Sequence, residues 1–281
     1  TPLEFIELAA GQLVSGDAVE GEMLAPNGKP SNLTPEQYRL VRTPEFIAFF
    51  GDWINDPKNA SKVVDENGEP LVVYHGTPTG GFTEFKEKGK RDSGFLGKAF
   101  YFTKDLQNAE AFTSRRESDG IVKKRQVYAT FLNVKNPLDV KDVDADKLIS
   151  MLEVYRKNKG LSPLSDKIKA DITEDFNGTY SATYSEKILK DNSDPSQLAE
   201  GNGYDGILGA REKAIAVFSP NQIKLADGGN TSFNPESNDI RFQVLPDGRK
   251  VQVKPLPDGV EVVNGFYSNT EKALAQIGDV K

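Results

Sequence analysis

The sequence of 281 residues contains no cysteine, one histidine and one tryptophan. The lack of cysteine excludes disulfides, thiol nucleophiles, iron–sulfur clusters and zinc sites built on thiolates. A single histidine also excludes any site that needs two imidazole groups, such as a zinc-binding helix with two histidines. The chemistry of this chain therefore uses neither a thiol nor a pair of histidines.

Long apolar runs and a strong basic charge are missing as well. No run of about 18 apolar residues is present, so we expect no membrane span. The first residues carry an acid and lack a basic start followed by an apolar stretch, so we expect no secretory signal peptide. The net charge of −7 argues against extended electrostatic binding to nucleic acid. A soluble protein of the cytoplasm is the expectation.

The first part of the chain has helical patterns. Residues 3–14 repeat apolar side chains at helical spacing, and residues 34–37, Thr-Pro-Glu-Gln, are typical of an N-cap with a capping box. A second helix restarts at Thr43. It carries four aromatic residues at spacings that predict a buried face: Phe46, Phe49, Phe50 and Trp53. Residues 1–58 are therefore expected to form an N-terminal helical segment.

From residue 61 the apolar period changes from helical to extended. Residues 62–64 and 71–74 flank an Asn-Gly turn and predict a hairpin. Further strands are expected over 99–103, 126–134, 204–208 and 214–218, and helices over 105–114, 145–157 and 164–190. Because strands outnumber helices and do not alternate with them regularly, the pattern predicts an α+β domain, over residues 59–230, rather than a doubly wound parallel sheet.

The last part of the chain is rich in turns. Residues 242–245 and 250–253 predict a hairpin, and residues 268–277 predict a short helix. We expect residues 231–281 to be a linker followed by the start of a further module.

The single histidine, His75, ends an apolar strand and is followed directly by Gly76 and Thr77. A glycine lets a ligand approach the backbone closely, and sites are often built where strands end in loops. Burial of His75 merely to fill space is the alternative. The residues alone favour neither a functional role nor a space-filling role for His75.

A second candidate feature is the loop over residues 93–99, which leads into an aromatic strand. Its two glycines, Gly94 and Gly97, do not form a phosphate-binding loop, because no Gly-Lys-Ser/Thr ending follows. Four basic residues near the loop either meet a pyrophosphate or belong to a solvated surface: Lys88, Lys90, Arg91 and Lys98.

The aromatic strand and the helix after it carry a possible ring-binding pair. Strand alternation presents Tyr101 on one face and Phe100 and Phe102 on the other. The following helix has Ala109 and Phe112 on one face. Tyr101 and Phe112 either sandwich a flat ring or pack as neighbours in the core.

Several different motifs follow one another in a set order along the chain. They are the strand ending in His-Gly-Thr (61–77), the glycine loop with Tyr-Phe (94–102), and the segments 128–138, 203–207, 217–224 and 233–242. This order resembles the ADP-ribosyltransferases of the His-Tyr-Glu type, which include poly(ADP-ribose) polymerases and diphtheria-like toxins. It is most similar to the ADP-ribosyltransferase modules of phage and prophage polyvalent proteins, and the likeness covers residues 43–242.

The resemblance implies a fold and a set of roles. The fold would have split, mostly antiparallel β-sheets around an NAD cleft, preceded by N-terminal helices. His75 would bind an NAD ribose hydroxyl, the backbone of Gly76 would hold the nicotinamide carboxamide, and Tyr101 with Phe112 would flank the nicotinamide ring. The other residues expected at the NAD site are Thr77, Ala109 and Arg91.

One position departs from the family's pattern. The catalytic set of the family pairs His75 and Tyr101 with a glutamate, and Ala214 stands at the position where that glutamate is expected. A methyl group cannot stabilise positive charge on a sugar. Glu212 and Gln222 are conceivable substitutes, and neither is favoured. If neither residue substitutes, Ala214 reflects either a natural loss of the catalytic glutamate or an engineered Glu-to-Ala change. The intact family sequence around Ala214 favours the engineered change.

The function implied by the resemblance is mono-ADP-ribosylation. ADP-ribose would pass from NAD to a macromolecular acceptor with release of nicotinamide and without a metal, in a toxin or phage effector that acts in the cytoplasm of a host or target cell. The acidic balance favours a protein acceptor over a nucleic acid. Immunity proteins or other polyvalent modules are further expected partners. The alternatives are a non-catalytic NAD-binding module, an NAD glycohydrolase and an RNA 2′-phosphotransferase.

Overall fold

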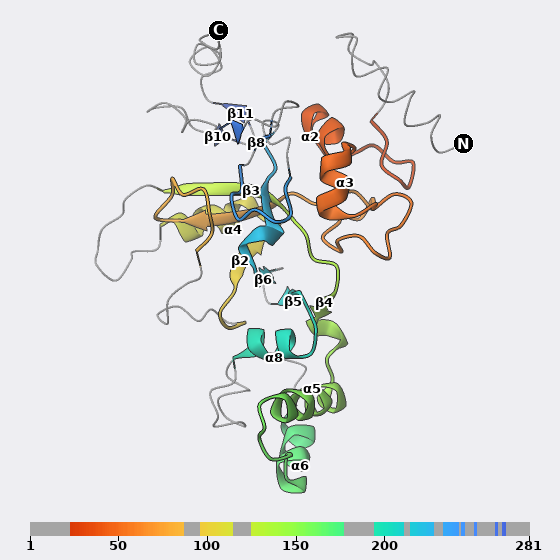
Figure 1. Cartoon of the computed structure of the whole chain (residues 1–281), viewed down its shortest axis with the longest axis vertical. Helices are drawn as coiled ribbons and strands as arrows, with labels where there is room; N and C mark the ends of the chain where they lie inside the picture. The colour runs from red at the N-terminus through yellow and green to blue at the C-terminus, as the bar shows by residue number, and fades with distance from the viewer. Residues whose placement is uncertain are drawn as a thin grey trace.

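The computed structural model of this chain describes residues 23–86, 96–114, 125–176, 194–210, 214–227 and 233–241, and four short strands beyond them. Figure 1 shows helices beside and below a central sheet. The helices predicted over 3–14 and 268–277 lie outside the described residues.

The central sheet has seven strands in the order β4-β5-β6-β2-β1-β3-β7. The strands are β1 (Val73–Thr77), β2 (Phe100–Thr103), β3 (Gln126–Leu132), β4 (Pro137–Asp139), β5 (Gly206–Ala210), β6 (Ala214–Val217) and β7 (Ile223–Leu225). Only β4 and β5 pair in parallel, and every other neighbouring pair is antiparallel. The prediction of an α+β fold rather than a doubly wound one is confirmed.

The sheet is split between β1 and β2. These strands pair only at Tyr74 and Thr103, whereas β1 pairs with β3 from Val73 to Thr77 and β2 pairs with β6 along its whole length. The two halves, β4-β5-β6-β2 and β1-β3-β7, thus meet at one residue pair, and β1 and β2 do not pair from there toward Thr77 and Phe100. This is the split, mostly antiparallel arrangement that the family resemblance implies.

The structure describes six α-helices. They are α2 (Pro35–Leu40), α3 (Pro44–Phe50), α4 (Leu106–Thr113), α5 (Ala145–Asn158), α6 (Asp166–Asp175) and α8 (Pro195–Gly201). In Figure 1, α2 and α3 lie beside the sheet, while α5, α6 and α8 lie below it. The last three follow β4 and precede β5, and we call them the helical lobe. The capping box predicted at Thr34 is present, since its side chain accepts from Gln37 N and the Gln37 side chain accepts from Thr34 N. None of the described helices is long and apolar enough to cross a membrane.

Two short β-hairpins lie beyond the central sheet. In the first, β8 (Gln243–Val244) pairs with β9 (Lys250–Val251), as the sequence predicts. In the second, β10 (Val262–Val263) pairs with β11 (Phe266–Tyr267), and the sequence analysis does not predict this hairpin.

The hairpin predicted over 62–74 is only partly present. A single bridge joins Val64 and Pro70, and regular strand begins at Val73. The turn is closed by backbone hydrogen bonds, from Asp65 N to Glu69 O at 2.8 Å and from Leu71 N to Val63 O at 3.0 Å. The Asp65 carboxylate adds to it by accepting the backbone N–H groups of Asn67 and Glu69, each at 2.9 Å. The helix predicted over 164–190 is seen as α6, and residues 177–193 lie outside the described part.

The four aromatic residues predicted to form a buried face are buried, which confirms their burial, but α3 ends at Phe50 and Trp53 lies in the turn that follows it. The ring of Phe46 lies 5.0 Å from that of Phe131 on β3 and 4.9 Å from that of Phe233, between ring centroids. Phe49 and Phe50 belong to the same fully buried cluster. The N-terminal helices therefore share a core with the sheet and with a residue beyond 230, while the proposed boundaries at residues 58 and 230 stay a prediction.

The segment after residue 232 is tied to the sheet by a buried lysine. Lys224 on β7 is fully buried, and its Nζ donates to Ser237 O at 2.5 Å and to Asp239 O at 3.3 Å. Burial lowers the pKa of Lys224 to about 8, partly opposed by Asp239. Ile240 N also donates to Thr83 O at 2.9 Å. Residues 233–241 thus pack against β7 and against the loop that follows β1.

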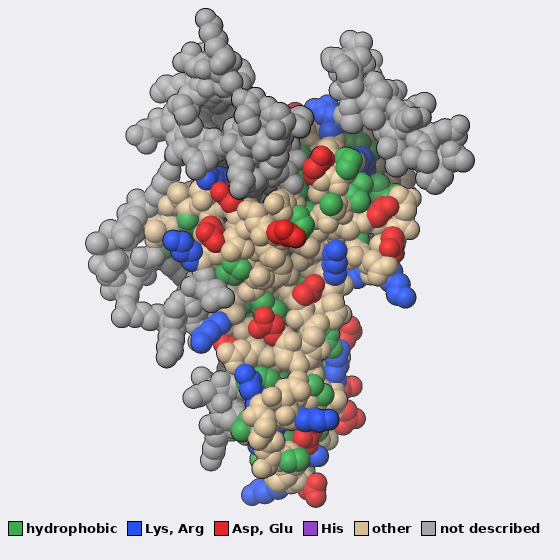
Figure 2. Space-filling model, in the orientation of Figure 1, with side chains coloured by type: hydrophobic (Ala, Val, Ile, Leu, Met, Phe, Trp, Pro, Cys, Tyr) green, Lys and Arg blue, Asp and Glu red, His purple; other side chains and the backbone are tan. Residues whose placement is uncertain are grey.

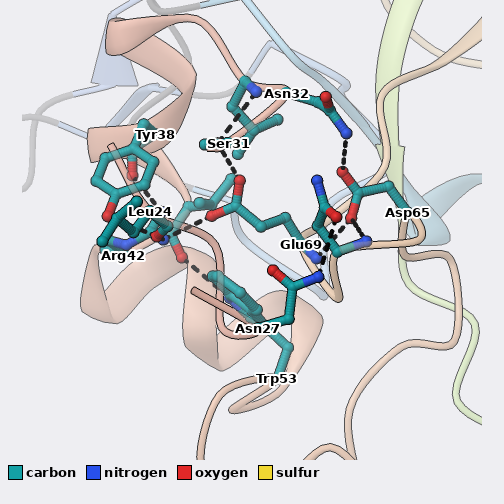
Figure 3. A network of polar contacts seen from close by, with 12 residues as sticks. Leu24, Asn27, Ser31, Asn32, Tyr38, Arg42, Trp53, Asp65 and Glu69 are labelled. Atoms are coloured by element: carbon teal, nitrogen blue, oxygen red, sulfur yellow. Dashed lines mark hydrogen bonds and ion pairs between the residues drawn. The ribbon is translucent and has the colours of Figure 1, made fainter. Parts of the chain in front are cut away.

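An ion pair joins the N-terminal helices to the turn before β1 (Figure 3). The Glu69 side chain is fully buried, and its Oε1 lies 2.6 Å from Arg42 Nη2. The Ser31 hydroxyl donates to the other carboxylate oxygen. The Arg42 guanidinium lies 3.3 Å from the centre of the Tyr38 ring, a cation–π contact. Because a buried carboxylate needs a partner, this pair holds the two regions together.

We predict that Arg42→Met lowers the free energy of unfolding by about 3–5 kcal/mol, since Glu69 then remains buried without its counter-charge. Arg39→Met is the matched control, because Arg39 pairs with Glu36 at 3.9 Å and both side chains are more than half exposed. Its cost is expected below about 1 kcal/mol. Urea unfolding measures both, and equal losses for the two variants would contradict the prediction.

Candidate functional site

His75 bridges the split in the sheet. Its Nδ1 lies 2.8 Å from the backbone oxygen of Tyr101 on β2. Because a carbonyl oxygen only accepts hydrogen bonds, Nδ1 carries the proton and Nε2 is the acceptor of the neutral ring. One imidazole thus links β1 to β2 beyond the point where their backbone pairing ends.

Aromatic rings surround His75 on its face of the sheet. The imidazole centroid lies 5.0 Å from that of Phe85 and 5.6 Å from that of Phe102. The nearby Tyr128 hydroxyl accepts from Gly81 N and Phe82 N and donates to Phe82 O. Burial raises the pKa of Tyr128 to about 12, so the hydroxyl keeps the proton that it donates. The loop after β1 is thereby held against His75.

Register places the other predicted site residues on the opposite face. Tyr74 pairs with Thr103, so their side chains share a face. By alternation along each strand, Gly76 and Tyr101 lie on that same face. Ala214 pairs with Thr103 from the other side and joins them. The structure therefore brings Gly76, Tyr101 and Ala214 together on one face, with His75 on the reverse face and bonded to the backbone of Tyr101.

Helix α4 packs on Gly76 without any intervening side chain. A Cβ added at Gly76 would lie 1.7 Å from Ala109 O, and Ala109 itself is buried. The helix begins at Asp105, whose side chain accepts from Gln107 N and Asn108 N. Phe112 follows Ala109 by three residues on the same helix face and is 36% exposed. The close approach at Gly76 therefore sets how near α4 and Phe112 lie to the sheet.

Tyr101 is held through its hydroxyl group. The hydroxyl donates to Gly97 O at 2.6 Å and accepts from Leu96 N at 2.9 Å. The ring is half-buried and packs against the apolar cluster of the helical lobe. Its position is therefore coupled to the loop that precedes β2.

Ala214 offers no group for acid–base or electrostatic chemistry, and Gln222 does not replace it. The Gln222 Oε1 accepts from Phe218 N and Ser219 N, and its Nε2 donates to Asn133 O and Asp205 O. These four bonds use the whole amide, and Gln222 lies beyond the end of β6 that is opposite Ala214. The substitute role considered for Gln222 is therefore wrong. Glu212 lies outside the described residues.

The remaining predicted residues are placed only in part. Thr77 ends β1, is partly buried, and its hydroxyl oxygen accepts from Thr79 N at 3.2 Å. Arg91 lies outside the described residues, as do Lys88 and Lys90. Within the described ranges, no group of three or more acidic, histidine or cysteine side chains is placed to hold a metal ion.

A residue that the sequence pattern does not single out also reaches this region. The Asp194 carboxylate, at the start of α8, accepts the backbone N–H of Lys98 in the loop before β2. The Asp-Pro pair at 194–195 is a helix-start signal that the sequence does contain. Nothing in that signal indicates a contact with a loop 96 positions away.

A cavity of about 350 Å³ opens at the other end of β6. It is lined by Asn133, Tyr204, Asp205, Phe218, Gln222 and Pro235, among others. Of the residues considered for the site, Gln222 lines this cavity, and its amide is fully used by backbone groups. His75, Gly76, Tyr101, Phe112 and Ala214 do not line it, so the candidate site is the split between β1 and β2 and not this cavity.

Comparison with known proteins adds one finding. A family model described as ADP-ribosyltransferase in polyvalent proteins matches residues 65–233. No curated protein and no solved structure matches the chain. The matched range runs from the turn before β1 to Phe233 and so contains the split sheet, α4 and the helical lobe.

We predict that Gly76→Ala displaces α4, because the new methyl group would overlap the carbonyl of Ala109. Backbone amide exchange in residues 109–113 is expected to speed up at least about tenfold, as the helix opens more readily. Gly160→Ala is the control, since that glycine has positive φ but nothing within 4 Å of an added Cβ. Exchange in α4 that is unchanged by Gly76→Ala would contradict the close contact.

Proposed function

This chain belongs to the family of ADP-ribosyltransferases in polyvalent proteins, and on that premise we propose that it binds NAD in the split between β1 and β2. The proposed reaction is mono-ADP-ribosylation, in which ADP-ribose passes to a macromolecular acceptor and nicotinamide leaves. One observation carries the proposal. Gly76, Tyr101 and position 214 share one face of the sheet, and α4 packs on Gly76 where the sheet opens.

The nicotinamide ring would lie between Tyr101 and Phe112. A flat heterocycle gains from contact with aromatic faces, and the two residues come from β2 and α4, on either side of the split. Phe112 is partly exposed, which leaves its ring able to contact a ligand. The backbone of Gly76 would bind the carboxamide of the nicotinamide. Ala109 would line the same pocket, Thr77 the adenosine side, and Arg91 the pyrophosphate.

His75 would have two tasks in this site. Its Nδ1–H is bonded to Tyr101 O, so the acceptor Nε2 is the ring atom suited to receive a hydrogen bond from a ribose hydroxyl. A ligand held by His75 would therefore be fixed relative to the backbone of Tyr101. The structural contact of His75 uses Nδ1, and the proposed contact with the ribose would use Nε2.

The catalytic step needs a group that Ala214 lacks. Cleavage of the bond between nicotinamide and ribose develops positive charge on the sugar, and a carboxylate placed beside it would stabilise that charge. Ala214 lies on the same face of the sheet as Tyr101, because it is two residues from Ala216, the cross-strand partner of Tyr101. We infer that this form binds NAD and turns it over poorly. A non-catalytic NAD-binding module is the second candidate, and the methyl group at position 214 is the observation that favours it.

The acceptor is proposed to be a protein rather than a nucleic acid. The net charge is −7, and Figure 2 shows acidic and basic side chains interspersed over the described part of the visible face. A surface that binds nucleic acid would gather basic residues. Immunity proteins or neighbouring modules of a polyvalent protein are the further proposed partners, for an effector acting in the cytoplasm.

We predict that Ala214→Glu releases nicotinamide from NAD at least about 100-fold faster than Ala214→Gln, because one well-placed charged group is worth roughly that factor in such reactions. The glutamine variant is matched in size and lacks only the charge. Chromatography of free nicotinamide measures the rate. Equal rates for the two variants, with NAD bound by both, would contradict the transferase function and favour a non-catalytic NAD-binding module.

The same Ala214→Glu protein separates a transferase from a glycohydrolase. With labelled NAD and a whole-cell lysate, a transferase labels a macromolecule, and the acceptor is then identified by its gain in mass. A glycohydrolase releases nicotinamide and labels none. An RNA 2′-phosphotransferase requires RNA that carries a 2′-phosphate, so removal of that RNA would stop its reaction.

A further inference from the structure

The loop before β2 has a backbone shape that requires a glycine. Gly97 has a φ of +89°, and a Cβ added there would lie 1.5 Å from Asp194 Oδ1. Both the dihedral angle and the close carboxylate exclude a side chain at this position. A group from the helical lobe therefore occupies the space beside the loop that leads to Tyr101.

Asp194 binds this loop as well as its own helix. Its two carboxylate oxygens lie 3.1 and 2.9 Å from Lys98 N. Its Oδ1 also accepts from Ser196 N at 2.9 Å and from the Ser196 hydroxyl at 2.5 Å. An N-cap role alone would need only the bonds within α8. The bonds to Lys98 N join the start of α8 to a loop that lies 96 positions earlier in the sequence.

Tyr101 holds the opposite side of the same loop. Its hydroxyl group donates to Gly97 O, the carbonyl of the same peptide group whose N–H, Lys98 N, is bound by Asp194, and it accepts from Leu96 N. Leu96 is fully buried in a cluster with Leu198 and Ala199 of α8. Residues 96–98 are therefore clamped between the Tyr101 hydroxyl and the start of α8.

We propose that Asp194 is a positioning residue for Tyr101 in NAD binding. The inference rests on the proposed function, since it takes Tyr101 as one wall of the nicotinamide pocket. Asp194 lies on the far side of the loop from Tyr101 and acts through the loop rather than by touching NAD. It fixes Gly97 and Leu96, and these fix the phenol ring. The helical lobe, inserted between β4 and β5, thereby contributes to the NAD site.

The competing view is that Asp194 serves only as the N-cap of α8. The chain offers a matched control for that view. Asp144 is the N-cap of α5 in the same lobe, and its side chain accepts from Lys147 N at 2.7 Å. Asp194→Ala and Asp144→Ala each remove one cap and cost helix stability in a similar way. Only Asp194 contacts the loop before β2.

The first measurement is NAD binding to the full chain by calorimetry. Asp194→Ala is expected to raise the Kd for NAD about tenfold, and Asp144→Ala is expected to leave it within about twofold. Asp194→Asn keeps one acceptor oxygen for Lys98 N and should recover most of the affinity. In the Ala214→Glu background, Asp194→Ala should raise KM with little change in kcat, because a ring wall binds the ground state and the transition state alike.

Hydrogen exchange of residues 96–101 tests the clamp without NAD. Asp194→Ala should speed exchange there, and Asp144→Ala should not. The proposal is overturned if exchange in these residues and NAD affinity respond equally to the two variants. If the unmodified chain binds no NAD, the proposed function fails. Faster exchange limited to Asp194→Ala would still support the clamping of residues 96–98 by Asp194, and unchanged exchange would still overturn it.

Discussion

The pairing of β1 with β2 at a single residue pair is the constraint on which the site depends. Beyond Tyr74 and Thr103 the two strands diverge, and the backbone groups of both are no longer satisfied by each other. His75 compensates from one face by bonding the Tyr101 carbonyl, and α4 lies against Gly76 on the other face. A cleft that remained open without these contacts would leave buried polar groups unpaired, which proteins avoid. The split is therefore held by the His75 side chain and by the packing of α4 on Gly76, and not by strand pairing.

Three regions outside the sheet hold these edges in place. The N-terminal helices anchor the turn before β1 through Arg42 and Glu69. Residues 233–241 hold the loop after β1 through Thr83 and Ile240. The helical lobe holds the loop before β2 through Asp194. Each region lies far from the others in sequence, and each contacts a segment next to β1 or β2. A module cut at residue 58 or 230 would lose the first or the second of these supports.

The sequence predicts the local features well, because their causes are local. Thr34 and Gln37 form their capping box within four residues, and the spacing of Phe46, Phe49 and Phe50 encodes a buried face. The strand that carries Tyr101 and the alternation along it also follow from neighbouring residues. Features that depend on distant contacts were not predictable. Asp194 reads as a helix cap until its partner Lys98 is known, and Gln222 reads as a free amide until four backbone groups surround it. The short strands β4 and β7 are too brief to show a period, and pairing with β5 and β3 defines them.

The central claim is that NAD binds in the split, and the substitution at position 214 makes a direct test practical. Without a carboxylate there, bound NAD should remain intact long enough for a crystal structure of the unmodified chain in complex with it. We expect a nicotinamide ring between Tyr101 and Phe112, with its carboxamide on the backbone of Gly76 and a ribose hydroxyl at His75 Nε2. NAD bound elsewhere, for instance in the cavity beside Asn133 and Tyr204, with the split closed, would contradict it.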